Sequence, residues 1–206
     1  MALFDFSELT EKDLTEKCLD RKESSENTST ALIEKYEGMH FRKIEGIRDL
    51  MGDYPAAGDI YFLWTQNQFN AVTFILYIIR NFSVIDELTF SSYAINERIV
   101  NSLAKWYDSG AIRRITIFIS DTVKVRNAKT HDLLVMQAER RGWQIIYAWN
   151  HSKIMLMKSG ENYFCIEGSG NLSDNSRFEN YIFTNNRRVY EFRKECICPR
   201  LPQSPL

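Results

Sequence analysis

A histidine and a lysine separated by one residue begin the most informative stretch of the sequence. His151 and Lys153 are followed by the run 168–171 (Gly-Ser-Gly-Asn) and then by Glu179. If residues 151–153 lead into a strand, the imidazole and the ammonium point to the same face, because side chains alternate along a strand. An imidazole is a nucleophile and an ammonium binds anions, so the pair is suited to phosphoryl chemistry.

The residues at 168–171 can complete such a site. Gly168 and Gly170 allow the backbone to turn tightly and to approach a substrate closely. Ser169 and Asn171 can then direct a hydroxyl and an amide at an oxyanion. With the imidazole and the ammonium, these groups form a phosphate site that contains its own nucleophile.

This combination of residues resembles a known motif. His151-x-Lys153 followed by Gly168-Ser169-x-Asn171, at a hairpin of an α/β domain, is similar to the motif of the phospholipase D superfamily. The elements between residues 55 and 195 resemble one half of that fold. The resemblance is greatest to the single-motif bacterial members, which are nucleases or nuclease-like proteins that work as homodimers.

The resemblance implies a role for each polar residue. His151 is expected to be the nucleophile, and Lys153 and Asn171 are expected to hold the phosphate. Glu179 corresponds to the downstream acid that orients the histidine of the partner copy. Ser169 has a supporting hydrogen-bonding role.

Two departures from the family pattern lie between the two parts of the motif. The fuller motif has an acid five residues after the lysine, and this chain has Lys158 there. The distance from Lys153 to Gly168 is also a few residues longer than usual, which the loop at 158–162 can absorb. In the family that acid mostly braces the fold. The departure therefore concerns local geometry more than chemistry, and a lost brace is compatible with a weakened or an inactive enzyme.

One copy of the motif is not enough for the reaction. Displacing an alkoxide from phosphorus requires a nucleophile and an acid for the leaving group, and two imidazoles can share these tasks. Neither His40 nor His131 lies in a second His-x-Lys, and the chain has no internal repeat. We therefore expect a homodimer in which a two-fold axis brings together two copies of His151, Lys153 and Asn171. Two ammonium groups then offset the charge of the phosphodiester, so neither a metal nor a cofactor is expected.

Basic residues near the expected site indicate a class of substrate. Lys124 and Arg126 follow a strand, and ligands gather at such strand ends, so both are expected to contact a nucleic-acid backbone. The formal net charge of −1 restricts any contact with nucleic acid to a local patch. The tryptophans are expected in the core, with Trp149, two residues before His151, as the best candidate for stacking on a base.

Together these features favour a metal-independent nuclease that acts on DNA or RNA through a phosphohistidine intermediate. A phospholipase or phosphatidyl-transfer enzyme is one alternative, for which residues 1–20 would have to supply an interfacial segment. A non-catalytic module that binds nucleic acid with the same fold and pocket is the other.

The elements that position these residues follow from the apolar pattern. Runs of strand length alternate with helical segments as far as residue 149, and a hairpin follows. Strands are expected at 60–64, 88–93, 115–119, 145–149, 153–157, 163–166 and 180–183. Helices are expected at 31–51, 69–80, 96–107, 130–141 and 187–196. This order predicts an α/β fold, with a mixed, mainly parallel β-sheet flanked by helices, that amounts to a phospholipase D-like half.

The chain divides where its composition changes. Residues 1–52 are expected to form a polar, helical N-terminal extension, residues 53–198 the phospholipase D-like domain, and residues 199–206 a tail. Charges interrupt the start of the chain, so no signal peptide is expected. The four cysteines are scattered, and the longest apolar stretch, 69–79, is about half as long as a membrane span. These features predict a cytoplasmic protein without membrane contact.

Overall fold

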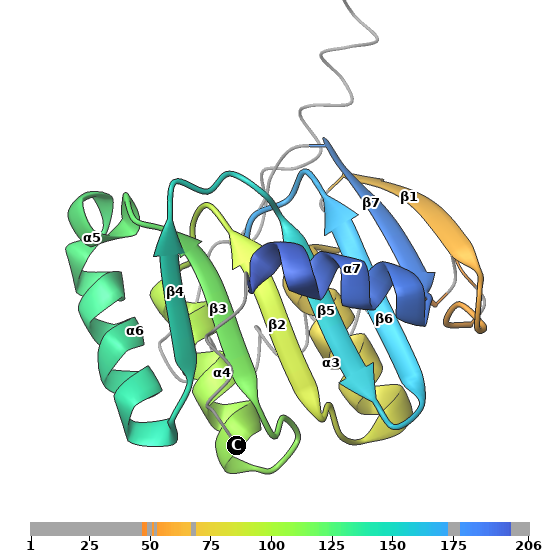
Figure 1. Ribbon diagram of the computed structural model, residues 1–206, viewed down its shortest axis with the longest axis horizontal. Coiled ribbons are helices and arrows are strands. Elements are labelled where there is room, and N and C mark those ends of the chain that lie inside the picture. The colour runs from red at the N-terminus through yellow and green to blue at the C-terminus, as the bar shows by residue number, and fades with distance from the viewer. Residues whose placement is uncertain (1–46, 49–50, 52, 67–68, 173–177, 199–206) are drawn as a thin grey trace, which may run out of the picture. The chain divides into compact units, whose positions relative to one another are not determined.

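The computed structural model describes residues 47–48, 51, 53–66, 69–172 and 178–198 of the chain. The elements, labelled as in Figure 1, are β1 (Ile60–Gln66), α3 (Ala71–Phe82), β2 (Glu87–Ser92), α4 (Glu97–Asp108), β3 (Ile115–Ser120), α5 (Val123–Arg126), α6 (Ala128–Arg141), β4 (Gln144–Ala148), β5 (Ile154–Ser159), β6 (Asn162–Gly168), β7 (Phe178–Asn185) and α7 (Arg187–Ile197). The expected N-terminal extension, apart from a few positions near its end, and the C-terminal tail lie outside the described residues.

Seven strands form one mixed sheet in the order β1-β7-β6-β5-β2-β3-β4. The pairs β2–β3 and β3–β4 are parallel. The other four neighbouring pairs are antiparallel. These pairings mean that β1, β2, β3, β4 and β6 point in one direction, and that β5 and β7 point in the other (Figure 1). The mixed α/β sheet flanked by helices is as predicted.

The proportion of parallel to antiparallel strand pairs differs from the expected, mainly parallel sheet. Four strands, β1 to β4, share one direction, as the helical crossovers between them require, and β6 joins that direction through its antiparallel pairing with β5. However, β5, β6 and β7 are inserted between β1 and β2, so antiparallel neighbours outnumber parallel ones in the described sheet. Apolar periodicity identifies a strand, but it does not specify which strand lies beside it.

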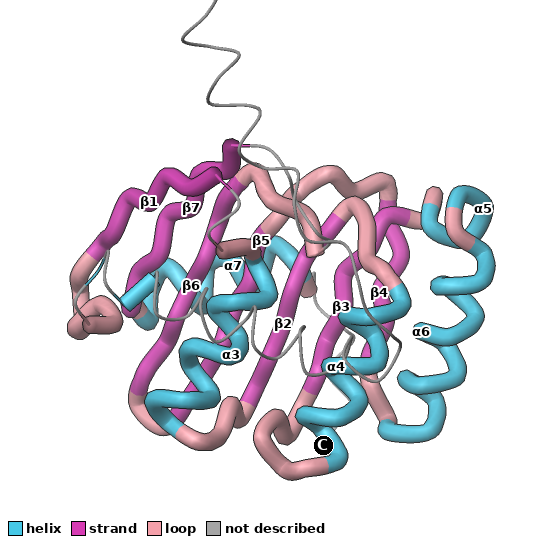
Figure 2. Tube along the Cα trace, turned by 180° about the vertical axis from the view of Figure 1, so that it is seen from behind, coloured by secondary structure: helices cyan, strands magenta, loops and turns pink. Residues whose placement is uncertain are grey.

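Helices cover both faces of the sheet. α3 and α4 lie on one face, which Figure 2 shows, and α7 crosses β2, β5 and β6 on the other face (Figure 1). The main core lies under α3 and α4 and includes the fully buried side chains of Phe74 and Phe90. A smaller core under α7 includes Leu156, Tyr190 and Ile197.

Asparagine side chains begin three of the helices. Asn70 accepts a hydrogen bond from the Thr73 amide at the start of α3, and Asn96 accepts one from the Ile99 amide at the start of α4. Asn186 does the same at the start of α7. These bonds satisfy backbone donors that a first helical turn leaves without partners. None of the helices in the described part of the chain is long and apolar enough to cross a membrane.

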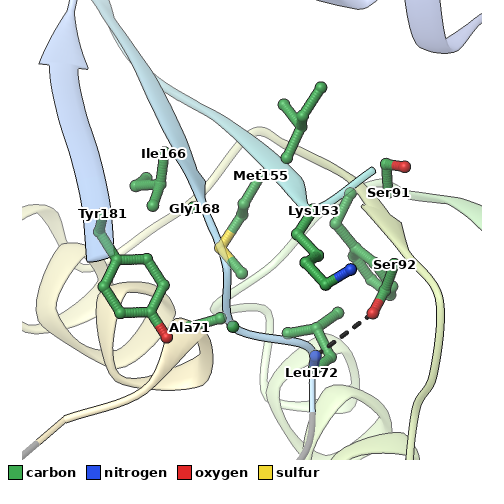
Figure 3. A pocket seen from close by; sticks show the side chains of 12 residues that line it. Ala71, Ser91, Ser92, Lys153, Met155, Ile166, Gly168, Leu172 and Tyr181 are labelled. Atoms are coloured by element: carbon green, nitrogen blue, oxygen red, sulfur yellow. Dashed lines mark hydrogen bonds between the residues drawn. The ribbon is translucent and has the colours of Figure 1, made fainter. Parts of the chain in front are cut away.

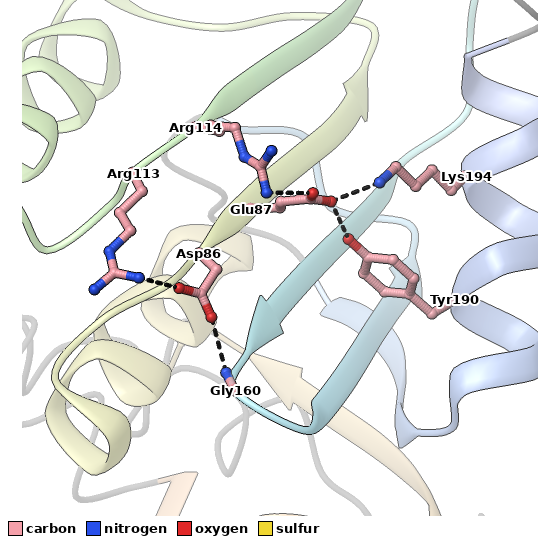
Figure 4. A network of polar contacts seen from close by, with 7 residues as sticks. All are labelled: Asp86, Glu87, Arg113, Arg114, Gly160, Tyr190 and Lys194. Carbon is pink, nitrogen blue, oxygen red and sulfur yellow. Dashed lines mark hydrogen bonds and ion pairs between the residues drawn. The ribbon is translucent and has the colours of Figure 1, made fainter.

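A carboxylate at the start of β2 holds α7 to the sheet (Figure 4). Glu87 accepts hydrogen bonds from Lys194 at 2.5 Å and Tyr190 at 3.2 Å on α7, and from Arg114 at 2.7 Å. Burial acts to raise the pKa of Glu87, but the hydrogen bond and charge of Lys194, together with Arg114, outweigh burial and lower it. The carboxylate is therefore charged at neutral pH, when it attracts both cations.

Candidate functional site

The segments that carry the motif meet at one edge of the sheet. Because β5 and β7 run against the other strands, the residues before them lie at the same edge as the residues after β2, β4 and β6 (Figure 1). This edge therefore collects the segments 91–93, 149–153, 168–172 and 178–179. The start of α3 reaches the same place, since Ala71 lines a pocket there.

His151 and Lys153 lie side by side in the segment that enters β5. The Lys153 ammonium is 3.3 Å from His151 Nδ1 and donates a hydrogen bond to the His151 carbonyl oxygen at 2.9 Å. The imidazole is exposed, and its ring centre is 5.0 Å from that of Tyr93 at the end of β2. An imidazole and an ammonium therefore lie together at this edge of the sheet; their roles as nucleophile and phosphate ligand stay predictions.

A buried amide holds this segment in place. Asn150 is 8% exposed and donates hydrogen bonds to Ser91 Oγ at 2.9 Å and to the Ser92 carbonyl oxygen at 3.2 Å. The side-chain oxygen of Asn150, Oδ1, accepts hydrogen bonds from the Ser152 amide at 2.9 Å and from the Ser152 hydroxyl at 2.7 Å. Ser152 also contacts Ser91 through a hydrogen bond between their hydroxyls. The residues before and after His151 are therefore both fixed to β2.

Lys153 covers a small pocket between the strands (Figure 3). The pocket has a volume of about 20 Å³, enough for about one water molecule. Its wall includes Met155, Gly170 and Tyr181, and the Lys153 side chain extends toward Ser92 at the end of β2. Burial lowers the pKa of Lys153, and the charge of Glu179 acts in the opposite direction. Lys153 and Glu179 are therefore electrostatically coupled across the site.

Gly168 and Ser169 join β6 to the second part of the motif. A Cβ atom at Gly168 would lie 2.2 Å from the Asn180 carbonyl oxygen, so this position accepts only glycine at the observed strand spacing. Ser169 donates its hydroxyl hydrogen to Glu179, and its oxygen accepts from the Asn180 amide at 3.1 Å. The Gly168 amide donates to the Lys153 carbonyl oxygen at 3.2 Å, so the two parts of the motif are directly connected.

The remaining predicted residues of this set are close to the pocket. Gly170 is buried in its wall, and Asn171 is partly buried directly after it. The next residue, Leu172, is anchored by a hydrogen bond from its amide to Ser92 Oγ at 3.3 Å (Figure 3). Glu179 accepts the hydrogen bond of the Ser169 hydroxyl, and its expected role toward the histidine of a second copy stays a prediction.

The predicted basic loop contains a short helix, α5. Arg126 donates a hydrogen bond to the Tyr93 hydroxyl, and Tyr93 in turn contacts the His151 ring. The Lys124 ammonium lies 3.9 Å from the ring centre of Tyr147 on β4. Both cations are exposed, and Arg126 is connected to the candidate nucleophile through one aromatic ring.

Lys158, which replaces the acid of the fuller motif, is at the far end of β5. Its ammonium lies over the ring of Tyr163, 5.6 Å from the ring centre. The turn that follows is held from β2 instead, because Asp86 accepts a hydrogen bond from the Gly160 amide at 2.9 Å (Figure 4). The same carboxylate forms an ion pair with Arg113 at 2.7 Å.

The structure also shows residues that the motif did not identify. Asn150, Ser91 and Tyr93 all support or contact His151, yet no local pattern marks them, because Ser91 and Tyr93 come from a strand about sixty positions earlier. His131 lies apart from these residues on α6, with Nε2 2.9 Å from the Tyr147 hydroxyl. Within the described residues, no three histidine, cysteine, aspartate or glutamate side chains gather into a potential metal site.

No family model and no curated protein sequence matches the chain. Among solved structures, the fold is similar to that of polyphosphate kinase from Porphyromonas gingivalis, with a TM-score of 0.51 and 16% identity over 79% of this chain and 28% of the kinase. Two further matches are TrmBL2, an archaeal chromatin protein (TM-score 0.47, 11% identity, 93% of this chain and 69% of that one), and phosphatidylserine synthase from Haemophilus influenzae (TM-score 0.45, 13% identity, 71% of this chain and 40% of that one). The chain therefore spans less than a third of the kinase and less than half of the synthase. The likeness to the kinase concerns the fold, and it agrees with the phospholipase D-like architecture expected from the motif.

Proposed function

We propose that the protein is a metal-independent phosphodiesterase that cleaves nucleic acid as a homodimer, with His151 as the nucleophile. The observation that carries the proposal is the pairing of an exposed His151 imidazole with the Lys153 ammonium beside the Ser169–Glu179 pair. The imidazole can attack a phosphate and the ammonium can neutralise its charge, while Glu179 holds the Ser169 hydroxyl at the same site. The fold similarity to a polyphosphate kinase supports phosphoryl transfer as the general class of chemistry.

The reaction would proceed in two displacements. In the first, an imidazole nitrogen of His151 forms a bond to phosphorus while the bond from phosphorus to the leaving oxygen breaks. A protonated His151 from a second copy donates its proton to that oxygen, so an alcohol departs and a phosphohistidine remains. In the second, water attacks the phosphohistidine, the second imidazole takes the proton of the water, and the first His151 is released.

The contact between Lys153 and His151 must change when substrate binds. An ammonium that donates to Nδ1 requires this nitrogen to be unprotonated, which places the single proton of a neutral imidazole on Nε2. A phosphate would attract the ammonium to its own oxygens. Nδ1 could then carry the proton and donate a hydrogen bond to a carboxylate such as Glu179 of a second copy, which leaves Nε2 free to attack.

Cleavage of a labelled oligonucleotide in the presence of EDTA tests the proposal. We expect the wild-type chain to cleave it and His151→Ala and Lys153→Ala to lose at least about 100-fold in rate, as expected for loss of a nucleophile or a placed cation. The matched controls His131→Ala and Lys129→Ala change a histidine and a lysine of α6, outside the motif, and should stay close to wild type; Lys129 forms an ion pair with Glu97 at 3.2 Å. Denaturing gels should also show a radiolabelled phosphate bound covalently to the wild-type chain and not to His151→Ala.

Two results would contradict the proposal. Equal cleavage by the wild type and by His151→Ala would exclude His151 as the nucleophile. Full activity of a chain that sedimentation shows to be monomeric at the assay concentration would exclude the shared site. Binding of oligonucleotide without turnover would instead favour the non-catalytic module.

A further inference from the structure

We infer that the surface next to His151 binds unpaired nucleotides, so that the substrate is single-stranded nucleic acid. We use the name aromatic platform for Trp149, which precedes His151 by two positions, and Tyr93, whose ring lies beside the imidazole, together with the cations Lys124 and Arg126, which contact Tyr147 and Tyr93. The inference rests on the proposed function, since it names the form of the nucleic acid that the same site would receive.

Trp149 is the feature of this surface that folding does not explain. Its side chain is 90% exposed, although it directly precedes the buried Asn150. Tryptophan is highly buried on average, and an aromatic side chain that is exposed beside basic residues can act as a stacking surface for unpaired bases. Trp149 is two residues from His151, which places their Cα atoms within about 7 Å of each other. A base stacked on this indole would therefore be a near neighbour of the phosphate at His151.

The cations of the platform are available for phosphate groups. Lys124 and Arg126 are exposed, and among the described residues their contacts are with the aromatic rings of Tyr147 and Tyr93. In the described part of the chain, neither takes part in an ion pair with a carboxylate, although the exposed Asp121 begins the same loop. Arg126 lies within hydrogen-bonding distance of the Tyr93 hydroxyl, and the Tyr93 ring lies beside the imidazole. The phosphate next to the scissile one would thus find a cation already held near the nucleophile.

Single-stranded nucleic acid fits the aromatic platform better than a duplex does. In a duplex both faces of each base are covered by neighbouring bases, so an exposed indole has no base face to contact. Unpaired bases offer free faces, and stacking on aromatic side chains is tolerant of sequence. Binding a duplex without base contacts depends on many phosphate contacts, whereas this chain has a net charge of −1 and two cations on the platform.

Binding measurements on a catalytically silent background can test the platform. The full chain carrying His151→Ala is titrated into fluorescein-labelled dT12 and rU12, and into a labelled hairpin duplex, with fluorescence anisotropy as the readout. We expect tighter binding to the single strands. Adding Trp149→Ala should weaken that binding by about 5- to 150-fold, the usual effect of losing one base–aromatic stack, while Trp149→Phe should retain most of it. Folding is not at issue, because the side chain is almost fully exposed.

Trp64→Ala is the matched control. Trp64 is 67% exposed on β1, and it points to the opposite face of the sheet from its neighbour Thr65, the cross-strand partner of Glu179. This variant should bind like the parent. The inference is overturned if Trp149→Ala binds single strands within twofold of the parent, if Trp64→Ala loses as much as Trp149→Ala, if the duplex binds as tightly as the single strands, or if neither single strand binds.

The same experiments separate this inference from the proposed function. Binding that depends on Trp149, in a wild-type chain that never cleaves, would refute the phosphodiesterase and retain the platform. Cleavage that depends on His151 but not on Trp149 would refute the platform and retain the phosphodiesterase.

Discussion

Replacing Asn150 by alanine should show whether the candidate nucleophile is held in place by β2. The side-chain nitrogen of Asn150 donates to Ser91 Oγ and to the Ser92 carbonyl oxygen. Its side-chain oxygen accepts from the backbone N–H and the hydroxyl of Ser152. A fifth contact, to the Phe118 carbonyl oxygen at 3.5 Å, is too long to count fully. Four sound hydrogen bonds at a buried position are therefore lost.

The expected cost follows from those four bonds. Each contributes about 0.5–1.5 kcal/mol net, and buried partners left without a bond add to the loss. Ser91 and Ser152 keep their mutual hydrogen bond, which reduces the total. We expect Asn150→Ala to lower the free energy of unfolding by about 2–4 kcal/mol, less than the total stability of a typical domain. The variant should therefore still fold.

Urea unfolding and steady-state cleavage measure the two consequences. Asn81→Ala is the control for stability. The exposed Asn81 side chain donates to the Tyr77 carbonyl oxygen at 2.7 Å within α3, and the higher helix propensity of alanine offsets the loss of this bond, so the change should stay within about 0.5 kcal/mol. In the cleavage assay Asn150→Ala should lower kcat by about 10- to 100-fold with a smaller change in KM, since a displaced nucleophile still leaves the substrate contacts. If Asn150→Ala is no less stable than Asn81→Ala, or cleaves at the wild-type rate, the positioning role is wrong.

Three further predictions concern the rest of the fold. Gly168→Ala should lower the melting temperature and impair cleavage, because its Cβ would overlap the Asn180 carbonyl oxygen; a wild-type melting temperature in a thermal scan would show that β6 and β7 can separate at no cost. The pKa of Glu87 is lowered in the folded state, so the stability that Glu87 contributes is present at neutral pH and is lost as the pH falls through that lowered pKa. Glu87→Gln should therefore make the free energy of unfolding in urea less dependent on acid pH. An unchanged dependence would contradict this. Burial raises the pKa of the Cys165 thiol, so a thiol reagent at neutral pH should modify the exposed Cys196 in the native protein and leave Cys165 unmodified until the chain unfolds, as mass spectrometry of the digested protein would show.

The elements of the fold were predictable because each has a local cause. The β-branched run at 115–119 forms β3, and the hairpin expected around residue 160 forms β5 and β6. Asn96 caps α4 as its position suggests, and Gly142 ends α6 in the left-handed conformation. In each case the residues that determine the element lie within it or directly beside it.

The arrangement of the strands was less predictable because it depends on contacts distant in sequence. β7 pairs with β1, so residues 60–66 lie beside residues 178–185. This pairing brings Glu179 to the site edge, yet no feature of either segment taken alone indicates the other. The same limitation explains why the motif identified His151 but not Ser91 of β2, which helps to hold its segment, or Tyr93 directly after β2, which contacts its ring.

The position of Lys158 shows why the departure from the family motif need not affect the chemistry. Lys158 is five residues from Lys153 along an extended strand, a separation of about 17 Å, so its charge lies far from the expected phosphate. At that end Asp86 holds the hairpin, since its amide donates to the Lys158 carbonyl oxygen at 2.8 Å and its carboxylate accepts from the Gly160 amide. The hairpin is thus held beside β2 at one end, and the segment that carries His151 is held by β2 at the other, without an acid at position 158. In the proposed mechanism, turnover then depends on a second copy of His151, which would donate a proton to the leaving oxygen.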